Sequence, residues 1–183
     1  MQDQGLGSIQ ITTDGALNDH MKAVMTHPSG SSCEVYLQGA HATSWKTPDG
    51  KEQLFTSSQA VYKDGTAIRG GIPVCWPQFG GLGPLAKHGF ARLSRDFEPI
   101  EMRGLASGAS ATGEEGPSLA SPDPKLVLRL EGSAVDKDWP HSFCLDISFE
   151  LSEWSLKVGM TVHNQNDGGE QLSFTGALHT YLR

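Results

Sequence analysis

Two arginines, a lysine and a histidine lie within one irregular stretch of the chain, residues 68–92. Arg69 lies at its start, Lys87 and His88 come near its end, and Arg92 closes it. Guanidinium groups bind phosphate oxygens in a bidentate fork, so Arg69 and Arg92 could hold a phosphorylated ligand. The alternative for all three cations is a surface ion pair with one of the numerous Asp and Glu side chains.

The same stretch is stiffened by glycine and proline. Gly70-Gly71 permits close backbone approach or a positive φ, and prolines on both sides of Trp76 restrict the chain there. Phe79 and Phe90 add aromatic side chains, which favour a packed segment that lines a concave site. Long surface turns are the alternative for the stretch, and a plain core position is the alternative for Trp76.

The elements that must position these residues show best toward the C-terminus. Apolar side chains fall on odd positions over 143–151 and on even positions over 154–162, with the change of parity at Ser152-Glu153. Alternation at period 2 places each set on one face of a strand, and a change of parity is typical of a tight reversal. The pattern predicts an antiparallel hairpin.

Shorter alternating runs predict further strands. Such runs cover 126–130 and 172–178, which gives four strands in the last third of the chain, and a strand pair is expected over 33–37 and 41–45. No segment sustains a period of 3.6 residues over three turns. The fold class predicted from these residues is therefore all-β, with helices as short connectors.

One region departs from this pattern. Residues 104–124 consist mainly of Gly, Ala, Ser, Glu and Pro, which is typical of a flexible loop or insert. No internal repeat and no linker between two cores is visible, so we expect a single domain over residues 1–183.

Composition excludes several classes of function. With 14 Lys+Arg against 21 Asp+Glu, the net charge is −7, which disfavours binding to nucleic acid or to an anionic membrane surface. No apolar run is long enough to span a membrane, and the first residues lack the regions of a signal peptide, so a cytoplasmic location is expected. Cys33, Cys75 and Cys144 are widely spaced, which predicts buried free thiols rather than disulfides or a zinc site.

Several separated motifs, taken in order, resemble the glucose-6-phosphate 1-epimerase (hexose-6-phosphate mutarotase) family, whose members are aldose 1-epimerase-like. The resemblance runs from about Cys33 to the last residue. The motifs that carry it are GAHATSW at 39–45, LF at 54–55, RGGIP at 69–73, CWPQFG at 75–80, HGFAR at 88–92, WPHSF at 139–143 and SFTGALHTY at 173–181.

This resemblance implies a fold and a reaction. The fold would be a galactose-mutarotase-like antiparallel β-sandwich with a concave sugar site. The reaction would interconvert the α and β anomers of a hexose 6-phosphate by acid/base ring opening, with no metal and no organic cofactor. A small-molecule hexose 6-phosphate would be the ligand, and no obligate protein partner is evident.

The resemblance also assigns roles to residues. His179 matches the catalytic acid, a role that suits imidazole because its pKa near ~6.5 allows proton transfer at neutral pH. Arg69 and Arg92 match phosphate and substrate contacts, Lys87 would add charge beside them, and His88 would bind substrate or support the site. A core histidine bonded to a backbone carbonyl is the alternative for His179.

The catalytic base is the main departure from the family pattern. In the family it is a glutamate well downstream of the catalytic histidine, and this chain stops at Arg183, so the sequence looks truncated and the sandwich incomplete. Glu98, Glu101, Glu150 and Glu170 show no feature that marks a substitute. Two alternatives therefore stay open: a non-catalytic module that binds sugar phosphates, and a β-sandwich that binds neutral sugars.

Overall fold

The computed structural model describes residues 5–14, 20–106, 121–132 and 139–183 of the chain. Its regular elements are strands and three short 3-10 turns, and no α-helix occurs in these residues. The turns are η2 (Gln38–Ala40), η3 (Ala91–Leu93) and η4 (Asp167–Gly169). The fold is all-β, as the sequence predicts.

The N-terminal part of the chain forms a five-stranded sheet in the order β4-β3-β2-β1-β7. Neighbouring strands are antiparallel, except that β7 runs parallel to β1. The strands are β1 (Ser8–Asp14), β2 (His20–Thr26), β3 (Ser32–Tyr36), β4 (His41–Lys46) and β7 (Leu105–Ala106).

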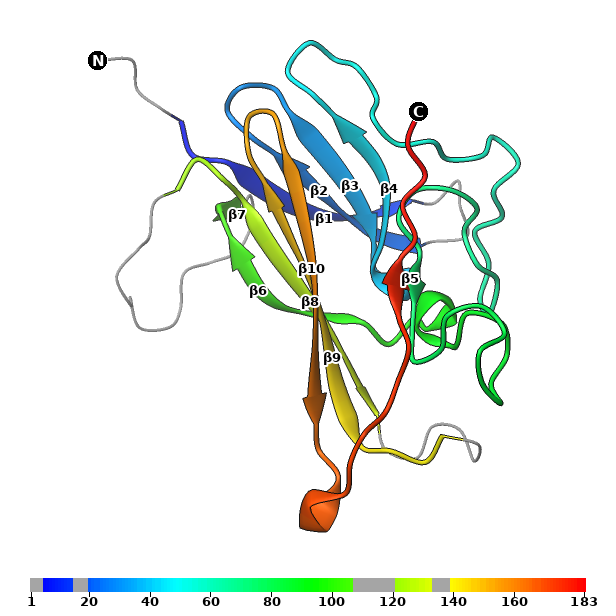
Figure 1. Ribbon diagram of the computed structural model, residues 1–183. Helices are drawn as coiled ribbons and strands as arrows, with labels where there is room; N and C mark the ends of the chain where they lie inside the picture. The colour runs from blue at the N-terminus through cyan, green and yellow to red at the C-terminus, as the bar shows by residue number, and fades with distance from the viewer. Residues whose placement is uncertain (1–4, 15–19, 107–120, 133–138) are drawn as a thin grey trace.

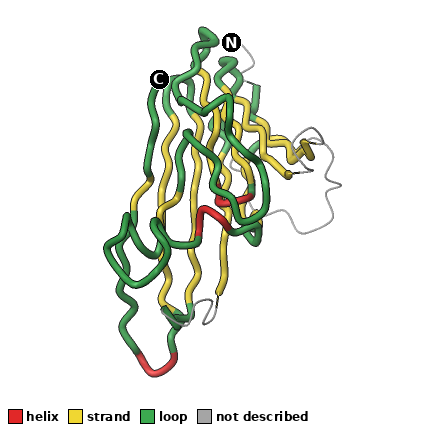
Figure 2. Tube along the Cα trace, turned by 90° about the vertical axis from the view of Figure 1, so that its right-hand side faces the viewer, coloured by secondary structure: helices red, strands yellow, loops and turns green. Residues whose placement is uncertain are grey.

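A four-stranded antiparallel sheet follows in the order β10-β9-β8-β6, and a separate pair joins β5 to β11. The members are β5 (Val74–Cys75), β6 (Glu98–Arg103), β8 (Lys125–Gly132), β9 (Phe143–Leu151), β10 (Leu156–Asn164) and β11 (Ala177–Leu178). Figure 1 shows the long strands β8–β10 running the height of the molecule, with β5 and β11 beside them. In Figure 2 the loops face the viewer in front of the strands.

The core lies between the two sheets. Met25 and Val35 of the first sheet belong to the same buried cluster as Leu128 of β8 and Ile147 of β9. All five odd-numbered residues of β9, from Phe143 to Leu151, are 0% exposed. Each such side chain stabilises the fold by about 1.5–3 kcal/mol through removal from water.

The predicted C-terminal hairpin is confirmed. Leu151 pairs with Leu156, so the reversal falls at residues 152–155 as the parity change indicates. The strand pair predicted over 33–37 and 41–45 is also present, as β3 and β4. WPHSF at 139–143 opens β9, and the three cysteines are free and buried.

Other expectations need correction. The strand predicted over 172–178 is regular only at Ala177–Leu178, because Thr175 bonds to the loop residues Pro77 and Phe79 rather than to a strand. The insert expected over 104–124 lies mostly outside the described residues, and its positions 105–106 form β7. Strands β1, β2, β5 and β6 were not predicted from the sequence.

Candidate functional site

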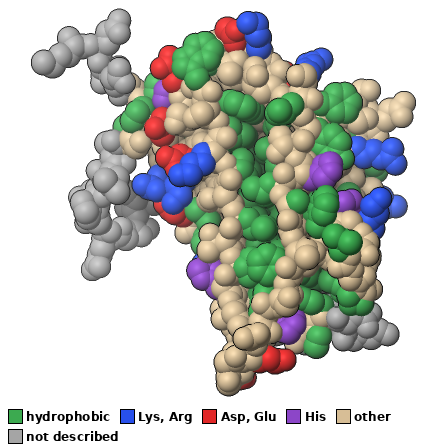
Figure 3. All heavy atoms as spheres, in the orientation of Figure 1, with side chains coloured by type: hydrophobic (Ala, Val, Ile, Leu, Met, Phe, Trp, Pro, Cys, Tyr) green, Lys and Arg blue, Asp and Glu red, His purple; other side chains and the backbone are tan. Residues whose placement is uncertain are grey.

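A pocket opens where the loops that follow β4 meet the C-terminal part of the chain. Its volume is about 640 Å³, within the range of ~300–1,000 Å³ usual for small-molecule sites. In Figure 3, Lys, Arg and His side chains gather on the right-hand face, beside a column of apolar side chains. Four predicted residues line the pocket together: Arg69, His88, Arg92 and His179.

The first wall is residues 69–71, here named the arginine segment. Each of its three carbonyl oxygens accepts one hydrogen bond: Arg69 O from the Ser57 N–H (3.0 Å), Gly70 O from the His41 imidazole (2.7 Å) and Gly71 O from the Tyr181 N–H (2.9 Å). These partners come from three different parts of the chain. The backbone of the arginine segment is therefore fixed, while the Arg69 side chain remains exposed.

Glycine is required at position 71. Its φ is +63°, and a Cβ there would lie 2.2 Å from the Ala42 carbonyl oxygen. The backbone can pass β4 this closely only without a side chain. Glycine at position 71 therefore lets the chain pack tightly against β4, and Arg69 lies two residues before this contact.

The second wall is residues 173–181, here named the histidine segment. Within it β11 pairs with β5, and the His179 N–H donates to Pro73 O at 3.0 Å. The His179 ring lies 4.8 Å from the Tyr181 ring and 6.0 Å from the His88 ring, measured between centroids. Its Nδ1 is buried without a hydrogen-bond partner among the described atoms, which leaves Nε2 as the nitrogen able to meet a ligand.

The tautomer of His88 follows from its backbone contact. His88 has a positive φ of 70°, and its Nδ1 accepts a hydrogen bond from the Gly80 N–H at 3.2 Å. The neutral ring therefore carries its hydrogen on Nε2. The pKa of His88 is lowered, first because partial burial penalises the imidazolium and then because Arg92 and Lys87 place positive charge nearby. His88 is thus suited to donate a hydrogen bond while neutral.

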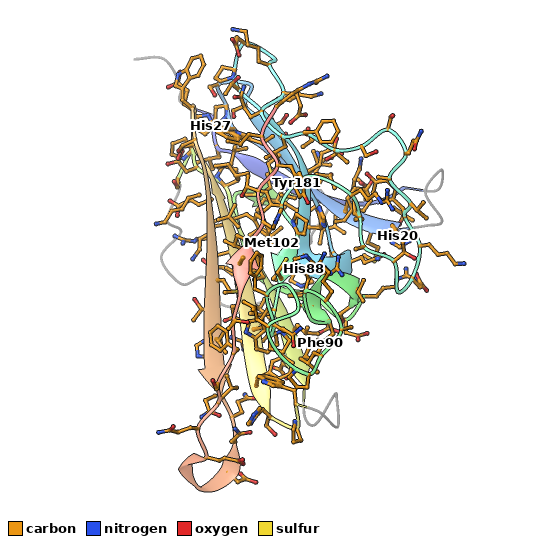
Figure 4. All side chains as sticks on the ribbon, turned by 45° about the vertical axis from the view of Figure 1, so that its right-hand side comes forward. His20, His27, His88, Phe90, Met102 and Tyr181 are labelled. Atoms are coloured by element: carbon orange, nitrogen blue, oxygen red, sulfur yellow. The ribbon has the colours of Figure 1, made fainter. Side chains whose placement is uncertain are left out.

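Arg92 and Lys87 differ in position. Arg92 is half-buried in η3, and its guanidinium donates to Lys87 O at 2.8 Å. The Lys87 side chain is exposed and is not among the residues that line the pocket. The predicted cationic cluster therefore consists of Arg69 and Arg92, with Lys87 contributing charge from outside. Figure 4 shows His88 and Tyr181 from different segments of the chain on the same side of the molecule.

Further lining residues were not predicted as site residues. Phe55 and Ser57 come from the loop after β4, and Tyr181 lies two positions after His179. The spacing of Tyr181 was a usable signal, because residues i and i+2 of an extended segment share a face. Trp76 is 0% exposed and packs edge-on against Trp139 and Phe143, so it belongs to the core.

The described residues that line the pocket include no Asp or Glu. Of the carboxylates considered from sequence, Glu101 is engaged by Lys125 and Arg103. Across the described ranges, no group of three or more His, Cys, Asp or Glu side chains gathers to hold a metal ion. The same residues contain no helix long and apolar enough to cross a membrane.

Two mostly antiparallel sheets and a pocket lined by two arginines and two histidines define an all-β protein with a cationic small-molecule pocket. Comparison with protein families matches residues 21–183 to the family described as aldose 1-epimerase. The chain belongs to the aldose 1-epimerase family.

Individual relatives agree with this assignment. Over 165 residues the chain is 37% identical to a protein named "Putative glucose-6-phosphate 1-epimerase" from Cenchrus ciliaris, covering 88% of this chain and 46% of the relative. A Salmonella typhimurium protein of the same name is 34% identical over 169 residues, covering 91% and 49%.

A solved structure shows the same fold. The crystal structure described as a "putative mutarotase (YeaD)" from Salmonella typhimurium matches with a TM-score of 0.69 and 30% identity, covering 91% of this chain and 49% of that one. The chain thus spans about half the length of the curated relatives it matches.

Proposed function

We propose that the chain binds a hexose 6-phosphate and serves the interconversion of its α and β anomers. The observation that carries the proposal is the convergence of Arg69, Arg92, His88 and His179 on one pocket of about 640 Å³. The names of the relatives support the substrate class. The arginines would hold the phosphate as charge-assisted forks, which are about twice as strong as neutral hydrogen bonds.

The chemistry needs one acid and one base. Ring opening removes the proton of the C1 hydroxyl and protonates the ring oxygen, and closure after rotation about C1–C2 gives the other anomer. His179 would protonate the ring oxygen through Nε2, and His88 would donate its Nε2–H to a sugar oxygen. The described pocket offers no carboxylate as base, and the family resemblance assigns that role to a glutamate outside these 183 residues.

Binding can be tested apart from turnover. Calorimetric titration with glucose 6-phosphate should show about tenfold to hundredfold weaker binding for Arg69→Gln and for Arg92→Gln, since hydrogen bonds to charged groups contribute ~1.5–3 kcal/mol. Arg103→Gln is the matched control, because Arg103 is exposed on β6 and pairs with Glu101. Unchanged affinity in both pocket variants would remove the phosphate assignment and favour a neutral sugar.

Turnover is tested by NMR exchange between the two anomers of glucose 6-phosphate. Loss of a general acid lowers the rate by about 10²–10⁴-fold. In a form of the protein that exchanges the anomers, His179→Asn should therefore abolish measurable exchange. An exchange rate within twofold of the unmodified protein would exclude His179 as the acid.

A second candidate function is a non-catalytic module that binds sugar phosphates. The lack of a lining carboxylate among the described residues favours it. Arginine-dependent binding of glucose 6-phosphate without exchange of anomers would establish this function for the chain.

A further inference from the structure

His41 lies where the two arginine-bearing parts of the pocket meet. It begins β4 directly after η2 and is 1% exposed. Just before it, Gly39 approaches η3 so closely that a Cβ would lie 2.7 Å from Arg92 O, and the Gly39 N–H donates to Ser94 O. The turn that leads into His41 is therefore packed against the turn that carries Arg92.

One nitrogen of His41 is committed to the arginine segment. Its Nε2 lies 2.7 Å from Gly70 O. A carbonyl oxygen only accepts, so Nε2 must carry the hydrogen. The other two carbonyls of the arginine segment are bonded by backbone N–H groups. His41 is thus the side chain that holds the backbone beside Arg69.

The other nitrogen of His41, Nδ1, is a hydrogen-bond acceptor without a donor among the described residues. With the hydrogen on Nε2, Nδ1 of neutral His41 carries a lone pair, and it is buried without a partner among the described atoms. Arg92 Nε, an N–H donor, is buried and unpartnered in the same way. Buried polar groups are almost always hydrogen-bonded, so each such atom calls for an explanation. Arg92 is close enough for its charge to act on His41.

We propose that His41 is the positioning residue that couples the two arginines of the pocket, through Nε2–H to the Gly70 carbonyl and through Nδ1 to the Nε–H of Arg92, directly or through one water, when phosphate binds. The proposal rests on the proposed function of Arg69 and Arg92 as phosphate contacts. In this arrangement the terminal N–H groups of Arg92 that are not bonded to the Lys87 carbonyl face the anion, and its Nε is held from behind. His41 does not contact the ligand.

The test compares two substitutions of His41. His41→Leu removes both the donor and the acceptor, whereas His41→Gln keeps an amide N–H for Gly70. Titration with glucose 6-phosphate should show at least tenfold weaker binding for His41→Leu and at most about threefold for His41→Gln. Titration with glucose should show equal affinity in all three proteins, because a purely structural loss would affect both ligands alike. His27→Gln, at another buried histidine, is the control and should match the unmodified protein.

A second measurement covers the case in which His41→Leu does not fold. In ¹⁵N NMR of the unmodified protein, the His41 ring should show the Nε2–H tautomer, and its Nδ1 resonance should shift upon saturation with inorganic phosphate. Arg92→Gln should abolish that shift.

The outcomes are distinct. Phosphate binding with an unmoved Nδ1 resonance, or with unchanged affinity in a folded His41→Leu variant, overturns the coupling role and leaves the proposed function intact. No binding of glucose 6-phosphate or phosphate by the folded, unmodified chain overturns both.

Discussion

The two walls of the pocket are held in different ways. In the arginine segment Gly70 and Gly71 are buried, and every carbonyl is bonded. In the histidine segment residues 173–176 are exposed, and the bonds run mainly to one loop, from Thr175 N to Pro77 O and from Phe79 N to Thr175 Oγ1. The difference indicates that the arginine segment is held along its whole length, whereas residues 173–176 of the histidine segment can open locally at lower cost.

The largest effect is expected from filling the space at the arginine segment. Gly71→Ala should destabilise the protein by about 4 kcal/mol, because a strained positive φ costs ~1–3 kcal/mol and overpacking against Ala42 O adds ~1–3. Urea unfolding measures the difference.

The matched control for this change is Gly50→Ala. Gly50 has a φ of +77° but nothing within 4 Å of the added Cβ, so only the conformational cost of ~1–3 kcal/mol should appear, without the overpacking. Equal losses at both positions would show that the arginine segment is not tightly packed.

The next effect comes from pH. The pKa of His41 is lowered to about 4, first by burial and also by the charge of Arg92, although its bond to Gly70 opposes the shift. In the unfolded chain its pKa is near ~6.5, so the unfolded state binds more protons between these values. Stability contributed by neutral His41 is complete above about pH 6.5 and should fall by about 3 kcal/mol as the pH drops to 4.

Unfolding by urea at several pH values measures this slope. His41→Gln should remove most of it, because glutamine does not titrate. His163→Gln should leave it in place, since the His163 side chain is 51% exposed. A slope that survives in His41→Gln would assign it to other groups.

A smaller loss of stability is expected from a change beside the histidine segment. Trp139 donates its indole N–H to Ser173 O at 3.0 Å and packs against Trp76. Trp139→Phe keeps an aromatic ring and removes the donor, which should cost about 1 kcal/mol.

Hydrogen exchange locates that loss. The amides of Thr175 and His179 should exchange faster in Trp139→Phe, while those of Gly71 and Ile72 should not change. Trp154→Phe, at a residue that is 59% exposed, should have no effect. Faster exchange at all four amides would mean that the two walls open together.

Strands could be predicted from the sequence where two consecutive segments both alternate between apolar and polar residues. β9 and β10 alternate in the same way and were predicted together, yet the inner residues of β9 are fully buried and those of β10 only half-buried. Periodicity reveals a face but not what covers it. β6 was missed because Ile100 and Met102 are exposed among charged residues, and pairing with β8 defines the strand.

The site was predictable to a similar degree. Motif resemblance named Arg69, His88, Arg92 and His179, and the structure brings them to one pocket. No role for His41 follows from the sequence, because its significance depends on the Gly70 carbonyl and on an unpartnered nitrogen. Neither feature has a signature in spacing. Hydrogen bonds between remote backbone and side chain are fixed only by the folded chain.

The pairing of β5 with β11 has a kinetic consequence. Val74 and Leu178 are neighbours in space but about one hundred residues apart along the chain. Leu54 and Leu182 also pair, and they are separated by a still longer stretch of sequence. Closing such loops has a high entropic cost, and folds dominated by distant pairings fold slowly. At ~5–20 residues per second, a ribosome completes the arginine segment roughly 5–20 s before the histidine segment emerges. The pocket therefore cannot form in the nascent chain until the histidine segment has been synthesised.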